Sequence, residues 1–98
     1  LAEFDGSWLT ALQESESALA RYAAQRDRVA TLQRSRDQSA EAARIARLRY
    51  QAGAEDFQIV LDTERTLATA EAQLALSQAE LSNRTITLFL ALGGGWQR

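Results

Sequence analysis

The residues that could do chemistry in this 98-residue chain are few. Carboxylates can serve as a general acid or base, and the chain contains two closely spaced pairs of them. The pairs are Asp62 with Glu64 and Glu14 with Glu16. Residues two apart on a helix point to different sides, so neither pair would share a substrate. The chain has no histidine and no cysteine, which excludes imidazole bases, thiol chemistry and nearly all zinc and iron sites. We therefore expect no enzyme activity, no metal site and no cofactor.

A second candidate is a group of arginines between residues 26 and 49. They could follow the phosphates of a nucleic acid along one helix. However, they scatter around the helix, acids interrupt them, and no aromatic residue lies among them for base stacking. We expect instead a solvated face with ion pairs between helices, for which Arg44, Arg47 and Glu64 are the candidates. The group consists of Arg26, Arg28, Arg34, Arg36, Arg44, Arg47 and Arg49.

The elements that would position these residues are helices. The chain has 19 alanines and no proline, a composition that strongly favours helix. The first helix is expected over about residues 3–51. Asp5 or Ser7 could cap its start, or Gly6 could lie inside it. Its large apolar residues form a slowly drifting stripe with small alanines around it. The stripe consists of Leu9, Leu12, Leu19, Tyr22, Val29, Leu32, Ile45 and Leu48.

The second helix is expected over about residues 56–92 and has a strict seven-residue repeat. Such a repeat predicts left-handed supercoiling against a neighbouring helix. Smaller residues in the rows on both sides of the apolar row indicate contacts with more than one helix. The alternative is a simple two-helix coiled coil. The apolar row consists of Val60, Leu67, Leu74, Leu81 and Leu88, flanked by Leu61, Ala68, Ala75, Ser82 and Phe89 and by Thr63, Ala70 and Ser77.

Between the two helices, residues 52–55 are expected to form a tight turn. Gly53 can adopt a positive φ and end the first helix, and Asp56 can cap the second. Tyr50 and Leu48 should then approach Val60 and Leu61. The three glycines from Gly93 resemble a phosphate loop only superficially, since no Lys-Ser/Thr follows. We expect them to end the second helix and to begin a C-terminal tail, 93–98.

These features predict one all-α domain over residues 1–98, a long antiparallel helical hairpin of the coiled-coil type. The net charge of −2 gives no general argument for nucleic acid or membrane binding. The chain starts without methionine and without a leader pattern, so we expect it to be a piece of a longer protein. Exposed apolar rows of this length also predict self-association, most simply a dimer forming a four-helix bundle.

The stretch "LRYQAGAEDFQIVLDTERTLATAEAQLALSQAEL" resembles the outer membrane factors of Gram-negative tripartite efflux systems, the TolC and OprM family. The shared pattern is Tyr-x-x-Gly, then "VLD", then Arg-x-Leu leading into a helix of alanine, leucine and glutamine. "LTALQESESALARYAAQ" upstream and "ALGGGW" downstream fit the same family. The resemblance covers nearly the whole chain.

The resemblance implies a fragment of a periplasmic α-barrel, the tip hairpin of a passive exit duct for drugs or other small molecules. It implies a homotrimer in the outer membrane, with this segment periplasmic. A periplasmic adaptor protein would dock at the tip and link it to an inner-membrane pump. Contact with the membrane is expected only through the family's β-strands, and none of those is expected in these residues.

The resemblance also implies roles for tip residues. Tyr50 matches a tyrosine that helps to hold the entrance closed, and Gly53 matches the tip glycine. Asp62 matches an aspartate that narrows the lumen in three copies, although it could instead pair with one of the arginines. Glu55 stands where TolC-like members have arginine, and Gln58 where OprM-like members have leucine. We expect a constriction formed by Asp62 with a softer Gln58 ring one turn away.

Three other functions remain open at this point. An adaptor protein also contains a long antiparallel hairpin, and a purely structural coiled coil would need no partner beyond itself. A helical nucleic-acid-binding module would use the arginine-rich segment.

Overall fold

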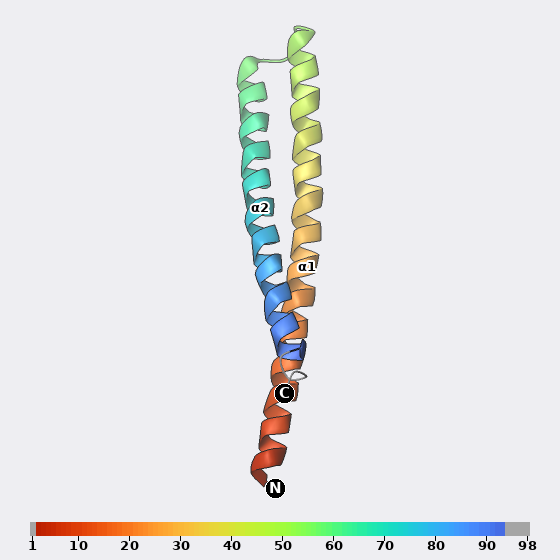
Figure 1. The fold of residues 1–98 in the computed structure, drawn as a ribbon. Coiled ribbons are helices and arrows are strands. Elements are labelled where there is room, and N and C mark those ends of the chain that lie inside the picture. The colour runs from red at the N-terminus through yellow and green to blue at the C-terminus, as the bar shows by residue number, and fades with distance from the viewer. Residues whose placement is uncertain (1, 94–98) are drawn as a thin grey trace. The chain divides into compact units, whose positions relative to one another are not determined.

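The computed structural model describes residues 2–93, with side chains from Trp8 onward, and contains two α-helices (Figure 1). Helix α1 comprises Ala2–Gln51 and helix α2 comprises Phe57–Gly93. Over the described range there is no strand, and the all-α fold class is confirmed. Within that range, neither helix contains an apolar stretch long enough to cross a membrane. The expected tail beyond Gly93 lies outside the described residues.

The start of α1 resolves one alternative left by the sequence. Because the helix begins at Ala2, Gly6 lies inside it, and neither Asp5 nor Ser7 occupies the position before its first residue. The expected second helix began at about residue 56, whereas α2 begins at Phe57, which leaves Asp56 directly before it.

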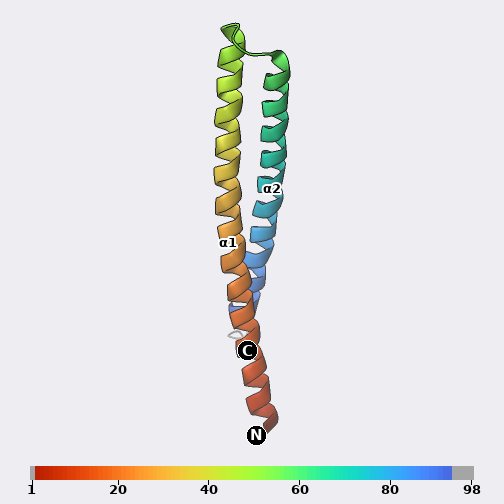
Figure 2. The same ribbon diagram turned by 180° about the vertical axis from the view of Figure 1, so that it is seen from behind.

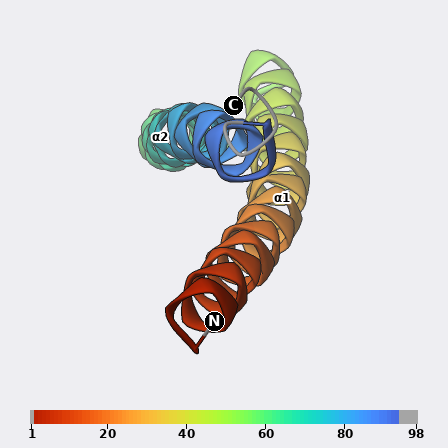
Figure 3. The same cartoon turned by 60° about the horizontal axis from the view of Figure 1, so that its bottom comes forward.

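The chain divides into two compact units. Arg28–Gln78 forms one unit, in which the end of α1 and the start of α2 lie side by side and antiparallel (Figures 1 and 2). Leu1–Asp27 and Ala79–Arg98 form the other. That unit thus combines the start of α1 with the end of α2, and Figure 3 shows both helices from below. A helical hairpin is therefore confirmed.

The reversal is built at the end of α1. Gly53 has a φ of 78°, a conformation open to glycine at little cost. Its N–H donates to the carbonyl of Tyr50 at 3.0 Å, and the N–H of Ala54 donates to the carbonyl of Arg49 at 2.8 Å. These two bonds form a Schellman motif, which satisfies carbonyl groups that the helix end would leave unpaired. The turn is thus tied to α1 by its own backbone.

In the Arg28–Gln78 unit, the two helices meet along a narrow seam of less exposed residues. Their spacing alternates between three and four, the pattern of a coiled coil. Ala43, Ala46, Val60, Ala70, Leu74 and Ser77 are buried, and Ala43 is completely so. Small side chains on α1 leave room for the leucines of α2, which allows the helices to approach closely.

The seam of α1 differs from the stripe expected from its large apolar residues. Val29 and Leu32 do lie in the seam, but Ile45 and Leu48 remain exposed, Leu48 at 52%. The expected stripe drifts around the helix, whereas supercoiled helices keep a strict alternation of three and four residues in contact. That alternation selects Ala43 and Ala46 and turns the larger neighbours outward.

In the unit formed by Leu1–Asp27 and Ala79–Arg98, a small residue of α1 is again buried while larger neighbours are exposed. Ala18 is buried on α1, and Tyr22 is half-buried, while Leu12 and Leu19 are exposed. On α2, Leu81 and Leu88 are half-buried, as their place in the seven-residue repeat predicts. Tyr22 and Leu88 line a shallow apolar hollow of about 450 Å³ with Thr85, Phe89, Leu92 and Gly93.

Candidate functional site at the hairpin tip

Tyr50 and Phe57 form an aromatic pair across the turn. Their ring centroids are 5.2 Å apart and the rings are tilted by 54°, an arrangement favoured by aromatic quadrupoles. Both side chains are about half exposed, Tyr50 at 46% and Phe57 at 51%. The sequence predicted that Tyr50 and Leu48 would approach Val60 and Leu61, and it did not predict the pair with Phe57. Val60 is buried in the seam, but Leu61 is exposed.

Gly53 and Glu55 occupy the connection itself. Space around Gly53 is open, because a Cβ atom added there would meet no atom within 4 Å. Glu55 is half-buried, and within residues 8–93 no ion pair or hydrogen bond of its carboxylate is recorded. Asp56 accepts from the Ile59 N–H at 3.1 Å through its backbone carbonyl. The sequence predicted that the Asp56 side chain would cap α2. Within residues 8–93, however, its carboxylate accepts no hydrogen bond from a backbone N–H.

Asp62 lies on the second turn of α2 with Gln58 one turn before it. The Gln58 Nε2 donates to Asp62 Oδ1 at 3.1 Å. This bond joins two of the residues that the sequence placed at the constriction. The spacing of four residues puts them on one face of the helix, which brings the amide within hydrogen-bond reach of the carboxylate.

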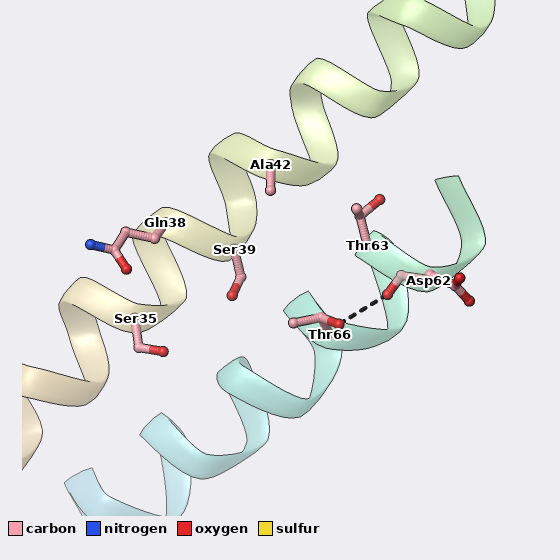
Figure 4. A pocket seen from close by; sticks show the side chains of 7 residues that line it. All are labelled: Ser35, Gln38, Ser39, Ala42, Asp62, Thr63 and Thr66. Atoms are coloured by element: carbon pink, nitrogen blue, oxygen red, sulfur yellow. Dashed lines mark hydrogen bonds between the residues drawn. The ribbon is translucent and has the colours of Figure 1, made fainter. Parts of the chain in front are cut away.

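Asp62 also borders a groove of about 290 Å³ between the two helices (Figure 4). On the α1 side Ser39 and Ala42 point toward α2, while the Asp62 carboxylate points away from α1. Thr66 donates its hydroxyl to the Asp62 carbonyl at 3.0 Å, and Thr63 donates to the Val60 carbonyl at 2.9 Å. The groove is lined by Ser35, Gln38, Ser39, Ala42, Asp62, Thr63 and Thr66.

The arginines near the tip have other partners than Asp62. Arg47 on α1 pairs with Glu64 on α2, an ion pair between the helices. Arg44, a candidate for the same kind of pair, instead binds Glu41 one turn earlier on its own helix, with Nε 3.0 Å from Oε2. Among residues 8–93, no ion pair to Asp62 is recorded.

The Glu41–Arg44 pair has an electrostatic consequence. The hydrogen bond from Arg44 lowers the pKa of the Glu41 carboxyl, and the same bond raises the pKa of the Arg44 guanidinium. Both side chains are exposed, so water screens the pair and its contribution to folding is small.

The tip side chains described here donate and accept hydrogen bonds and form ion pairs. Among the described residues, no three acidic side chains group closely enough to hold a metal. Sequence reasoning missed Glu41 and Phe57. Glu41 precedes Arg44 by three residues, a spacing that favours ion pairs, and Phe57 is the first residue of α2.

A second stripe of α2 lies outside the seam. In the Arg28–Gln78 unit it consists of Leu61, Arg65, Ala68, Ala72 and Ala75, again spaced by four and three residues, and all are exposed. The pattern extends along the helix to Ser82, Ile86 and Phe89, also exposed. Small residues in such a repeat suit the close approach of another helix.

Comparison with known proteins gives a consistent result. The family model described as "Outer membrane efflux protein" matches residues 1–94. The chain is 46% identical to the pyoverdine export outer membrane protein OpmQ of Pseudomonas putida over 61 residues, 62% of this chain and 13% of that protein. It is 39% identical to the cation efflux system protein CusC of Escherichia coli over 89 residues, 90% of this chain and 19% of that protein.

A solved structure agrees with these relatives. The outer-membrane channel OprN superposes on the whole chain with a TM-score of 0.78 and 37% identity, and the match covers 22% of the OprN chain. The chain therefore spans about a fifth or less of the length of these three proteins.

Proposed function

Because the chain belongs to the outer membrane efflux protein family, we propose that it is the periplasmic tip hairpin of an efflux channel. In this role the hairpin is part of a passive exit duct for drugs or other small molecules and carries no catalysis. The turn at Gly53 lies at the periplasmic entrance. The entrance opens and closes by rearrangement of the helices around it.

This proposal rests mainly on the hydrogen-bond partner and the orientation of the Asp62 carboxylate. Its carboxylate accepts a hydrogen bond from Gln58 and points away from α1. It takes no part in the ion pairs of Arg44 and Arg47, whose partners are Glu41 and Glu64. Three such carboxylates around a narrow lumen would repel one another and attract cations. Gln58 then forms the softer ring beside the Asp62 ring. Tyr50 and Glu55 lie at the same end of the hairpin, where they contact neighbouring helices in the closed state.

Assembly follows from the second stripe of α2. A helix with two heptad stripes can pack against a partner on each side, as a closed barrel of helices requires. We infer a homotrimer in the outer membrane, with a periplasmic adaptor protein docked at the tip and an inner-membrane pump behind it. No nucleic acid takes part.

The family match favours this function over the alternatives left by the sequence. An adaptor hairpin, a purely structural coiled coil and a nucleic-acid-binding module would each belong to a different family. The arginines moreover form ion pairs with acids of the chain at Arg36, Arg44 and Arg47, which reduces their use for phosphate contacts.

The proposal is tested by planar-bilayer recordings of the full-length trimer. Asp62→Ala should raise the single-channel conductance or weaken block by multivalent cations, because three negative charges leave the narrowest part of the lumen. Glu71→Ala is a matched control, since Glu71 is an exposed acid of α2 farther from the tip. If Asp62→Ala leaves both quantities unchanged, Asp62 does not form the constriction.

A further inference from the structure

The polar and aromatic contacts at the tip show which links join the two helix ends. The backbone bonds of the turn that involve Ala52, Gly53 and Ala54 all lead back to α1. The recorded side-chain links between α1 and α2 near the turn are two, the ion pair of Arg47 with Glu64 and the ring pair of Tyr50 with Phe57. The ring pair is the one closer to the turn.

Phe57 is well placed to act on Tyr50. It is the first residue of α2, so its backbone is fixed by the helix that follows, and its ring lies 5.2 Å from the Tyr50 ring. Tyr50 is in the last turn of α1, where its carbonyl already accepts the Gly53 N–H. With the backbone of Tyr50 held by the Schellman motif, the remaining freedom is that of its side chain, and Phe57 restricts it.

We propose that Phe57 is a positioning residue for Tyr50, holding the phenol ring at the tip surface in the orientation needed for contact with a neighbouring helix. The inference rests on the proposed function, in which Tyr50 helps to keep the entrance closed. Both rings are half exposed, so each retains a free face for such a contact. An aromatic pair of this geometry changes an equilibrium by about 2- to 10-fold.

The test uses single-channel recordings of the full-length trimer with four variants, Tyr50→Ala, Phe57→Leu, Phe57→Tyr and the double variant Tyr50→Ala/Phe57→Leu. Phe57→Leu keeps an apolar side chain but removes the ring. We expect Phe57→Leu to raise the frequency of channel opening by about 2- to 10-fold. Phe57→Tyr keeps the ring and should open as often as the wild-type channel. The double variant should open no more often than Tyr50→Ala alone, because Phe57 acts through Tyr50.

A control separates positioning from general packing. Leu76→Ala removes an apolar side chain that is 73% exposed, away from the tip, and should leave the opening frequency unchanged. Thermal unfolding of each variant identifies any loss of folding, and Phe57→Tyr remains informative if Phe57→Leu unfolds. Additive effects of Tyr50→Ala and Phe57→Leu, or normal closure in Phe57→Leu, overturn the inference. If Tyr50→Ala itself closes normally, the proposed role of Tyr50 falls and the inference falls with it.

Discussion

Individual acids of the tip differ in what they contact. Glu64 binds an arginine of the opposite helix, Glu41 binds an arginine of its own helix, and Asp62 accepts from the Gln58 amide. Among these three acids, Asp62 is the one with no arginine partner within residues 8–93. This difference makes Asp62 the residue on which the proposed constriction depends.

The ion pair of Arg47 with Glu64 should contribute little to stability. Both side chains are more than a third exposed, so solvent screens their attraction. We expect Glu64→Gln to lower the free energy of unfolding of the 98-residue chain by about 0.2–1 kcal/mol. Urea denaturation of Glu64→Gln, Arg47→Gln and the double variant measures the coupling between them. A coupling well above this range would show that the pair is shielded from water.

The pH dependence of stability should have a contribution from Glu41. Its pKa is lower in the folded chain than the ordinary value of 4.5, because Arg44 hydrogen-bonds to the ionised form. The stabilisation is therefore present above the unfolded pKa and is lost as the pH falls through the folded pKa. Glu41→Gln should reduce the loss of stability on acidification below about pH 4.5. Circular-dichroism melts across this range give the measurement, and an identical pH profile would contradict it.

At the scale of the elements, Gly53 determines where α1 ends. Its φ of 78° is unfavourable for other residues, while the space around it is open. Gly53→Val should therefore destabilise the chain by about 1–2 kcal/mol or more through backbone strain rather than through a clash. Gly53→Asn should cost less, because asparagine tolerates this conformation better. Equal losses in urea denaturation for the two variants would contradict a conformational origin. In the full-length trimer, Gly53→Val should also impair adaptor docking.

The sequence predicted these elements well because their signals are local. Absence of proline, abundance of alanine and one glycine between charged helix ends specify two helices and a turn. The repeat of Val60, Leu67 and Leu74 likewise predicted the seam of α2.

Other features depend on tertiary contacts. The seam of α1 contains Ala43 and Ala46 rather than Ile45 and Leu48, because the register of the supercoil decides which positions face α2. Arg44 was a candidate for an ion pair between the helices, whereas the partner observed is Glu41 on its own helix. The ring contact of Tyr50 with Phe57 depends on the turn conformation, which spacing alone does not determine.

For the molecule as a whole, the exposed second stripe of α2 should drive association. We expect the 98-residue chain to form a helical oligomer, most simply a dimer, because the exposed alanines allow close helix packing. Ala72→Glu should weaken the oligomer by placing charge on the stripe. Gln73→Glu is a matched control that adds the same charge beside the stripe. Sedimentation equilibrium decides the matter, and a monomer at high concentration for the unmodified chain would contradict the expectation.

In the proposed channel, three copies of this tip should meet at a narrow entrance. Cross-linking in the full-length trimer tests it most directly, with a single cysteine at Asp62→Cys in an otherwise cysteine-free protein. Leu76→Cys is the control, two heptads along the same row of α2 and away from the tip. Under oxidation we expect a covalent dimer for Asp62→Cys and little or none for Leu76→Cys. Absence of the dimer from Asp62→Cys, or equal yields at the two positions, would contradict the claim.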